Sequence, residues 1–429
     1  MIEVVKFPKR ESWTELLKRP QLEVKNLNAL VEEVFKGVEQ EGDEALKAYT
    51  SRFDNVELNS TVVSKAELND ASSLLSGALK SAIQLAAGNI ERFHKSQIMQ
   101  EAKVETMAGV SCWRKSIGIE HVGLYIPGGT APLFSTVLML GIPARIANCK
   151  NVILCSPPDK NGSINPAILY AAKLVGITDV FKVGGIQAIA ALAIGTDSVP
   201  RVSKIFGPGN QYVTSAKQFA QNYGVAIDMP AGPSELLVFA DDSGEPDFIA
   251  ADLLAQAEHG ADSQVLLVTT DLELLQKTMI SIQNQLKYTA RKLICMAALS
   301  NSKAFLVEDE GIAINMINEY APEHLIVVSK REDMFLNEVV NAGSVFLGNY
   351  TPESAGDYAS GTNHTLPTNG YAKSYSGVSV DSFVRKITYQ KITKEGLNNI
   401  GPAIELMAEA ECLNAHKNAV TIRLKKDEV

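Results

Sequence analysis

The chain has few cysteines, and their positions do not suggest cross-links. Its 429 residues include five, at positions 112, 149, 155, 295 and 412, and no two of them form a C-x-x-C pair. An odd number without close pairs argues against a disulfide framework and against a structural zinc finger. Free thiols are typical of a reducing cytosol, so we expect a cytoplasmic protein.

Long apolar runs and a surplus of positive charge are also missing. No window reaches the roughly 18 to 20 apolar residues of a membrane-spanning helix, and the N-terminus lacks the apolar run of a secretory signal. The formal net charge is -9. A surface that follows nucleic-acid phosphates or anionic lipids needs clustered Lys and Arg, so we expect neither a nucleic-acid partner nor a membrane partner.

Histidine is scarce as well, with six in the whole chain. One of them, His364, shares the polar segment 353–367 with Asp357, and two glycines interrupt this segment. A carboxylate and an imidazole are both able to bind a metal ion. Because the segment has so little apolar content, we expect it to be a loop outside the core.

What the chain has in plenty is apolar sequence arranged in short, regular blocks. Its length and 46% hydrophobic composition exceed what one core usually serves, so two or more domains are expected. Residues 21–100 have helical spacing, and the sequence after about Asp381 has it again. Between them, from Ile117, apolar runs alternate with helical stretches in two successive groups, which indicates two α/β units with mostly parallel sheets. The expected strands are 122–126, 152–155, 180–183 and 203–206 in the first unit, and 235–239, 264–268, 325–328 and 345–347 in the second.

A glycine-rich turn in the first unit is a candidate nucleotide site. Residues 207–210, Gly-Pro-Gly-Asn, follow an expected strand and open a helix, so their amides could receive a pyrophosphate. The third glycine of the dinucleotide fingerprint is absent, and alone such a turn is usually only a tight connection. However, Tyr125, Gln187 and Asn210 all lie at or after the carboxyl ends of strands, where open sheets bind ligands.

Gln256 and His259 are three residues apart near the end of an expected helix and point to the same side. This spacing could place two ligands on one metal ion, although such a pair is more often a solvated helix end. Asp357, His364 and His416 would strengthen the metal hypothesis only if the fold brings them near.

Glu323 and His324 stand where a helix gives way to a strand, just after Pro322. At the start of a strand both side chains can reach one cavity, where an acid and an imidazole can share proton transfer. A polar turn is the alternative.

Helix ends and the beginnings of following strands share one edge of a β-α sheet. We therefore expect one polar cluster at the amino edge of the second unit, consisting of Ser234, Gln256, His259, Glu323 and His324. If this edge faces the nucleotide candidates, the two groups meet in an interdomain cleft.

Several long motifs resemble those of the histidinol dehydrogenase family. The most specific is SAGDYASGTNHTLP at residues 354–367. Five others are GLYIPGG at 123–129, FGPGN at 206–210, PAGPSE at 230–235, QAEHG at 256–260 and YAPEHL at 320–325. The resemblance extends over nearly the whole chain.

The resemblance implies an α/β fold with two Rossmann-like domains and parallel-rich sheets, plus a helical N-terminal region and a C-terminal helical appendage. We expect residues 1–104 to form the N-terminal region, packed against the second α/β domain. Residues 105–127 and 234–380 would form the substrate and zinc domain, and 128–233 the NAD-binding domain. Residues 381–429 would form the appendage, which reaches the partner subunit of a homodimer.

The resemblance further implies a zinc-dependent, NAD-linked enzyme. It would oxidise L-histidinol through L-histidinaldehyde to L-histidine with two NAD+, which is the last step of histidine biosynthesis. One zinc ion per subunit would be held by Gln256, His259, Asp357 and His416. The substrate would contact this zinc site and also Ser234, His324, His364 and Glu411. The residues expected to contact NAD are Tyr125, Gln187 and Asn210.

Two neighbouring residues are the expected catalytic pair. His324 would act as the base in the alcohol oxidation, and Glu323 would take a proton from the water that adds to the aldehyde. Glu411 and His416 would act across the dimer interface, in active sites shared by the two subunits. Competing hypotheses are a metal-dependent hydrolase that uses the same zinc cluster and a nucleotide-binding regulatory protein without turnover.

Overall fold

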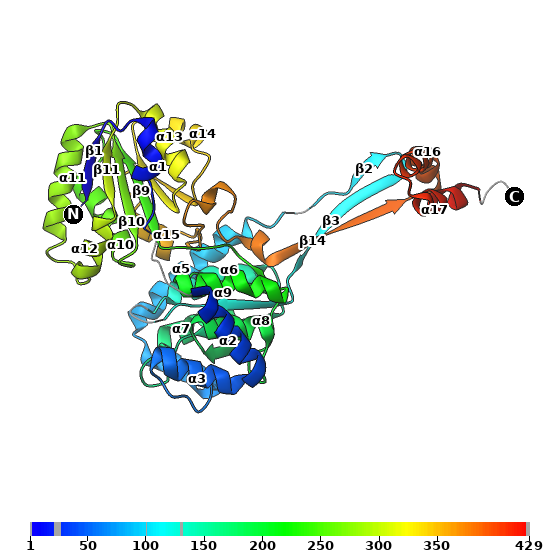
Figure 1. The fold of residues 1–429 in the computed structure, drawn as a ribbon, viewed down its shortest axis with the longest axis horizontal. Helices are drawn as coiled ribbons and strands as arrows, with labels where there is room; N and C mark the ends of the chain where they lie inside the picture. Colours follow the sequence, from blue (N-terminus) through cyan, green and yellow to red (C-terminus); the bar gives the residue numbers. More distant parts are fainter. Residues whose placement is uncertain (1, 21–26, 100, 129–131, 426–429) are drawn as a thin grey trace. The chain divides into compact units, whose positions relative to one another are not determined.

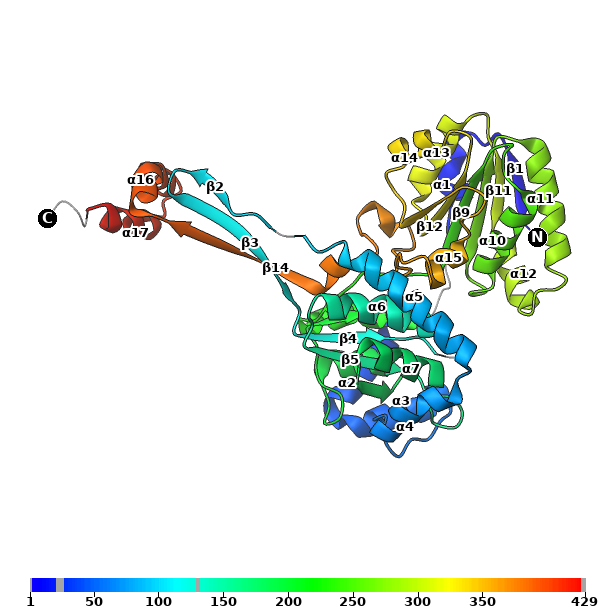
Figure 2. The same cartoon turned by 180° about the vertical axis from the view of Figure 1, so that it is seen from behind.

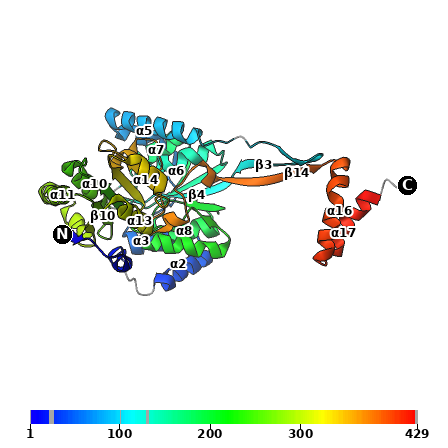
Figure 3. The same ribbon diagram turned by 90° about the horizontal axis from the view of Figure 1, so that it is seen from above.

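The computed structural model describes residues 2–20, 27–99, 101–128 and 132–425. The chain forms two compact units: the first contains residues 1–97 and 119–383, and the second contains 98–118 and 384–429. Figures 1, 2 and 3 show the ribbon from three sides. Within the described ranges, no helix is both long and apolar enough to cross a lipid bilayer.

One of the two large sheets of the first unit has five parallel strands in the order β6-β5-β4-β7-β8. Its strands are β4 (His121–Tyr125), β5 (Asn151–Ser156), β6 (Asp179–Lys182), β7 (Lys204–Phe206) and β8 (Ala226–Ile227). The helices that alternate with them are α6 (Phe134–Ile146), α7 (Pro166–Val175), α8 (Gly185–Ile194) and α9 (Gln211–Ala220). Asn165 and Asn210 cap α7 and α9 by accepting hydrogen bonds from the first backbone amides.

Most of the N-terminal helices pack against the helices α6 to α9 that accompany this five-stranded sheet. The helices are α2 (Leu27–Glu41), α3 (Asp43–Asp54), α4 (Lys65–Asp70), η2 (Ala71–Leu74) and α5 (Gly77–Lys95). Val31, Val34 and Phe35 of α2 share a core with Ile153 and Val183, and Figure 2 shows α5 beside α6. The expectation that residues 1–104 pack against the second α/β domain is therefore wrong for these helices. An apolar stripe determines which face of a helix is buried, but not which sheet buries it.

The other large sheet has six parallel strands in the order β1-β11-β10-β9-β12-β13. Its strands are β1 (Glu3–Lys6), β9 (Glu235–Ala240), β10 (Gln264–Thr269), β11 (Lys303–Leu306), β12 (His324–Val328) and β13 (Ser344–Leu347). Of the N-terminal residues that the structure describes, only those before position 20 join it, through β1, η1 (Arg10–Ser12) and α1 (Trp13–Leu16). Neither β1 nor β11 was among the expected strands, and both are short.

Helices cover both faces of the six-stranded sheet (Figure 1). One face packs against α10 (Pro246–Ala257), α11 (Leu272–Gln285) and α12 (Lys292–Ser300). The opposite face packs against α1, α13 (Glu310–Tyr320) and α14 (Glu332–Glu338). Burial on both faces explains why these strands are continuous apolar runs rather than alternating ones.

The polar segment 353–367 is not an exposed loop, contrary to the expectation. It begins with α15 (Glu353–Tyr358), and Glu353, Asn363, Thr365 and Leu366 are buried. Its buried amide is hydrogen-bonded: the Asn363 side chain donates to the Met139 carbonyl at 2.6 Å and accepts from the Thr365 backbone N–H at 3.0 Å. Polar side chains can be buried when such hydrogen bonds replace water. The first unit ends with η4 (Tyr371–Lys373) and η5 (Val380–Phe383).

The second unit is an antiparallel sheet in the order β14-β3-β2, followed by two helices (Figure 3). Its elements are β2 (Val104–Met107), β3 (Val110–Gly118), β14 (Val384–Ile392), α16 (Lys394–Ala410) and α17 (Asn414–Leu424). The appendage expected from residue 381 is therefore helical only after a strand. Likewise, the range 105–127 is divided between β3 in this unit and β4 in the five-stranded sheet, so its assignment to the zinc domain is wrong. The pairing of β3 with β14 joins distant parts of the chain, which no local pattern reveals.

Candidate active site

A cluster of ionisable side chains lies at the amino edge of the six-stranded sheet. Strands β9 and β12 are parallel neighbours, with His324 level with Leu236, so His324 begins its strand beside the start of β9. From the other elements come His259, just after α10, and Asp357, near the end of α15. The Asp357 carboxylate lies 3.6 Å from His324 Nε2 and 4.0 Å from His259 Nε2. The structure thus brings together residues from the three motifs that the sequence singled out.

His324 is buried and surrounded by acids. Its Nδ1 lies 3.6 Å from the Glu323 carboxylate, 3.6 Å from the Glu353 carboxylate and 3.3 Å from the Glu235 carbonyl oxygen. Burial would lower the pKa of the imidazole, but the charges of Glu323 and Glu353 and the nearby Asp357 carboxylate raise this pKa well above its ordinary value. The surrounding carboxylates therefore favour the imidazolium form of His324.

Asp357 is a member of the acidic cluster whose charged form is favoured by its surroundings. Burial by itself would raise the pKa of its carboxyl group, but the neighbouring His324, His364 and His259 outweigh burial and lower the pKa. A carboxylate that stays charged among buried polar side chains is a suitable ligand for a divalent cation.

Glu353 is a site residue that the sequence analysis missed. One ligand atom each of His259, Glu353 and Asp357 lie within 4.8 Å of one another. Burial, together with the charges of Asp357 and Glu323, raises the pKa of the Glu353 carboxyl well above its ordinary value, although His324 opposes this. Glu353 and Asp357 are four residues apart on α15 and thus share a helix face. This spacing is visible in the sequence only if the segment is recognised as a helix.

Several buried polar atoms in this cluster have no hydrogen-bond partner among the described residues. They are both side-chain amide atoms of Gln256, Nε2 of His324 and both carboxylate oxygens of Glu353. Gln256 is near the end of α10, which packs against α15. Unsatisfied buried groups of this kind call for a partner such as an ion, a water or a ligand.

His364 connects this cluster to the helices of the five-stranded sheet. Its Nε2 lies 3.0 Å from the Thr136 hydroxyl of α6, and its Nδ1 lies 2.9 Å from the Asp357 carbonyl oxygen. Burial lowers the pKa of His364, which favours a neutral ring. Ser234 is half-buried directly before β9, so it too lies at the amino edge that the sequence analysis predicted.

The three nucleotide candidates lie at the carboxyl edge of the five-stranded sheet, as expected, but differ in exposure. Tyr125 ends β4 and is buried; its hydroxyl accepts a hydrogen bond from the Gly185 N–H at 3.2 Å, and burial raises its pKa to about 12. Gln187 is buried in α8 and donates to the Asp54 carboxylate at 3.3 Å. Asn210 is exposed at the start of α9. Tyr125 and Gln187 therefore stabilise this edge of the sheet through their hydrogen bonds, while Asn210 lies on its surface.

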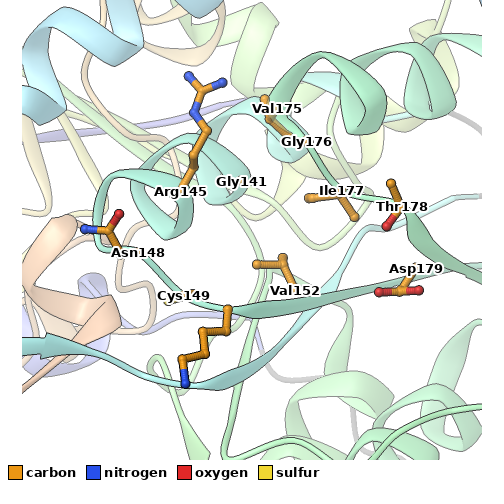
Figure 4. A pocket seen from close by; sticks show the side chains of 11 residues that line it. Gly141, Arg145, Asn148, Cys149, Val152, Val175, Gly176, Ile177, Thr178 and Asp179 are labelled. Carbon is orange, nitrogen blue, oxygen red and sulfur yellow. The ribbon is translucent and has the colours of Figure 1, made fainter.

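A separate cavity of about 400 Å³, shown in Figure 4, lies at the opposite edge of this sheet. Lys150 and Val152 line it at the start of β5, and Asp179 lines it at the start of β6. Because these strands are parallel, the amino ends lie away from Tyr125, so this cavity does not belong to the nucleotide candidates.

Glu411 and His416 belong to the second unit. Glu411 follows α16, His416 lies in α17, and both are exposed. Their expected role across a dimer interface stays a prediction.

Comparison with known proteins identifies the family. The model of the family described as histidinol dehydrogenase matches residues 17–424. The chain belongs to the histidinol dehydrogenase family. The histidinol dehydrogenase of Bacteroides thetaiotaomicron is 59% identical over 424 residues, which cover 99% of each chain. The chloroplastic histidinol dehydrogenase of Arabidopsis thaliana is 52% identical over 416 residues, which cover 96% of this chain and 88% of the relative.

Solved structures agree with this assignment. The crystal structure of histidinol dehydrogenase from Elizabethkingia anophelis superposes with a TM-score of 0.98 at 55% identity, covering 100% of this chain and 99% of the other. An acetylating aldehyde dehydrogenase from Geobacillus thermoglucosidasius, at 14% identity, reaches a TM-score of 0.50 over 89% of this chain and 94% of its own, and thus shares the fold alone. A histidinol dehydrogenase is an oxidoreductase of histidine biosynthesis, so the hydrolase and regulatory hypotheses no longer apply.

Proposed function

We propose that the chain oxidises L-histidinol through L-histidinaldehyde to L-histidine and reduces two NAD+ per substrate. The observation that carries this proposal is the buried pair His324 and Glu323, 3.6 Å apart, beside the Asp357 carboxylate. An imidazole and a carboxylate side by side provide the two proton acceptors that two successive oxidations require.

The polar cluster fits a zinc ion. Gln256, His259 and Asp357 offer an amide oxygen, an imidazole nitrogen and a carboxylate oxygen, and His416 of a second copy of the chain would add another nitrogen. The buried Gln256 amide has no partner among the described residues, which supports its role as a ligand. Zinc held there would orient the substrate's imidazole and amine and would offset the negative charge around His324.

The first oxidation converts the alcohol to the aldehyde. His324 takes the proton of the substrate's hydroxyl group while a hydride leaves the carbon that carries this group. The imidazole must be neutral at the start to accept that proton. Because the carboxylates around it raise the pKa of His324, its neutral form depends on positive charge nearby. The metal requirement and the base role of His324 are thus linked.

The second oxidation needs water. A water molecule adds to the aldehyde carbon and gives one proton to Glu323. The hydrated aldehyde then gives its remaining hydroxyl proton to His324 as a second hydride leaves, which yields the carboxylate. The Glu235 N–H donates to a Glu323 oxygen at 2.8 Å and thereby holds this side chain in place. Glu323 therefore acts mainly in this step, whereas His324 serves both.

NAD would supply the hydride acceptor at the carboxyl edge of the five-stranded sheet. Residues 207–209 precede α9, and its first amides could receive the pyrophosphate. Asn210 offers an exposed side chain there, while Tyr125 and Gln187 fix the neighbouring backbone.

We further propose a homodimer in which Glu411 and His416 complete the partner's active site. None of the residues of α17, all of which are described, is buried. Large apolar side chains of the two terminal helices are exposed, including Leu406 at 68%, Met407 at 65% and Ile422 at 55%. An apolar surface of this kind is typical of an interface. A cytoplasmic location stays a prediction, supported by five free cysteines that all lie in described parts of the chain.

The decisive experiment counts NADH formed per L-histidinol consumed, with native protein, after chelation and after zinc is restored. Two NADH per substrate, lost on chelation and regained with zinc, would support the proposal. One NADH would indicate an enzyme that stops at the aldehyde, and none from folded, zinc-loaded protein would contradict the proposed reaction.

A further inference from the structure

Arg19 is fixed in the interior of the first unit by several contacts. Its Nε donates to Glu235 Oε1 at 2.5 Å and its Nη2 to Glu235 Oε2 at 2.8 Å, and the two side chains are 16% and 3% exposed. The same Nη2 donates to the Tyr320 carbonyl at 2.7 Å, and the guanidinium lies 3.9 Å from the centroid of the Tyr320 ring. A two-point ion pair combined with ring stacking holds both partners in one geometry.

Glu235 in turn contacts both members of the catalytic pair through its backbone. Its N–H donates to Glu323 Oε2 at 2.8 Å, and its carbonyl oxygen lies 3.3 Å from His324 Nδ1. Its carboxylate also accepts a hydrogen bond from the Asn369 N–H at 2.6 Å. The side chain of Glu235 therefore fixes the start of β9, and the backbone there fixes the two side chains that move protons.

The charge of Arg19 is needed because Glu235 has acidic neighbours. Burial raises the pKa of the Glu235 carboxyl, Arg19 lowers it, and the charge of Glu323 raises it again. Without Arg19, Glu235 would be an unpaired buried acid beside Glu323. Such a group moves toward water or takes up a proton, and either change disturbs the backbone that it anchors.

We propose that Arg19 is a positioning residue for the reaction, acting through Glu235 on Glu323 and His324. This inference rests on the proposed function of those two residues. It predicts a loss of turnover without a loss of NAD affinity, because Arg19 and Glu235 pack with the six-stranded sheet, whereas the NAD candidates lie on the five-stranded one.

The test compares Arg19→Met, Arg19→Lys and the double variant Arg19→Met/Glu235→Gln with the native enzyme. Arg10→Met is the matched control, since Arg10 also pairs with an acid, Glu319 at 3.4 Å, and stacks on a ring, but is 64% exposed. For Arg19→Met we expect kcat to fall at least about tenfold for both oxidations, with the KM for NAD+ within about twofold of native. Arg19→Lys should recover part of kcat, and the control should match native.

The double variant separates positioning from folding. It removes both buried charges, so its thermal midpoint should return toward native. Its kcat should stay low, because a neutral glutamine no longer has a guanidinium to hold it. Recovery of kcat together with the midpoint would overturn the inference, as would native kcat in folded, zinc-loaded Arg19→Met.

Failure of the proposed function has a different signature. If Glu323→Gln oxidises histidinaldehyde at the native rate, the role of Glu323 is wrong whatever the Arg19 variants do. If that variant is impaired but Arg19→Met is not, only the inference about Arg19 fails.

Discussion

Lys217 and Asp228 form a buried ion pair that encloses the backbone of Gly207. Their charged atoms are 2.5 Å apart, and the side chains are 3% and 1% exposed. The Lys217 ammonium donates to the Gly207 carbonyl at 2.8 Å, and the Gly207 N–H donates to the Asp228 carboxylate at 2.8 Å. The first residue of the glycine turn is thus held on both sides.

Lys217→Met should destabilise the protein strongly, because it leaves the Asp228 carboxylate buried and unpaired. We expect the free energy of unfolding to fall by about 3 to 5 kcal/mol, measured by urea denaturation. Lys330→Met is the control: its ion pair with Asp242 is exposed, so the loss should stay below about 1 kcal/mol. Equal losses of unfolding free energy in the two variants would contradict the idea that burial makes the Lys217–Asp228 pair important for stability.

Gly207→Ala should weaken NAD+ binding. The residue has a φ of 131°, and an added Cβ would lie 2.1 Å from the Tyr125 carbonyl oxygen, so the turn must shift. We expect the dissociation constant for NAD+, measured by calorimetry, to rise at least about tenfold, the effect of roughly 1.4 kcal/mol. Gly176→Ala is the control, because Gly176 also has a positive φ, of 90°, but no atom within 4 Å of the new Cβ. An unchanged NAD+ affinity in Gly207→Ala would argue against this turn as the binding site.

Glu323→Gln and His324→Asn should separate the two oxidations. Glu323→Gln should slow histidinaldehyde oxidation by about 100-fold and histidinol oxidation much less, because only the second step needs a proton taken from water. His324→Asn should slow both. Each half-reaction is assayed alone by NADH absorbance. Equal losses in the two half-reactions for Glu323→Gln would refute the division of labour.

Mixing two inactive variants should restore activity if active sites are shared. In a dimer of one His259→Ala chain and one His416→Ala chain, one site keeps both histidines. Random mixing makes half of the dimers mixed, so about a quarter of native activity should return. The composition of the mixed dimers is verified by mass spectrometry with differently tagged chains. Their failure to turn over substrate would place His416 outside the partner's site.

His94 should make stability depend on pH. Burial lowers the pKa of His94, whose Nδ1 lies 2.8 Å from the Ile90 carbonyl oxygen and whose Nε2 lies 3.3 Å from the Asn363 amide. Below the ordinary pKa of about 6.5 the unfolded chain takes up a proton that the folded chain resists, so stability falls as pH falls. The free energy of unfolding, measured by urea denaturation, should therefore fall less between pH 7.5 and pH 5.5 in His94→Gln than in the native protein. His121→Gln, at the half-exposed start of β4, should behave like native, and a native-like loss in His94→Gln would exclude this role.

The sequence predicted those elements whose formation depends on residues close together in the chain. Strands such as β5 and β9 are buried on both faces and therefore appear as uninterrupted apolar runs. The amino-edge cluster followed from topology, because helix ends and strand starts meet there.

Features that depend on distant partners could not be read in the same way. Strand β14 forms against β3 from far earlier in the chain, and α2 gives no sign of which sheet it will cover. The segment 353–367 looked too polar for burial because its hydrogen-bond partners, such as the Met139 carbonyl, lie on another element. Glu353 was missed for the same reason, since its role depends on the helical form of that segment.

The pairing of β1 with β11 sets an order for folding during synthesis. The five-stranded sheet and the helices that cover it draw only on residues up to β8, which ends at Ile227. By contrast, β1 is made before the other strands of its sheet but must wait for β11, at residues 303–306, and β13 follows later still. Because domains fold as units while the chain is made, one half of the first unit can form while β1 still lacks its partner. Strand β1 is therefore synthesised early but is among the last strands of the first unit to pair.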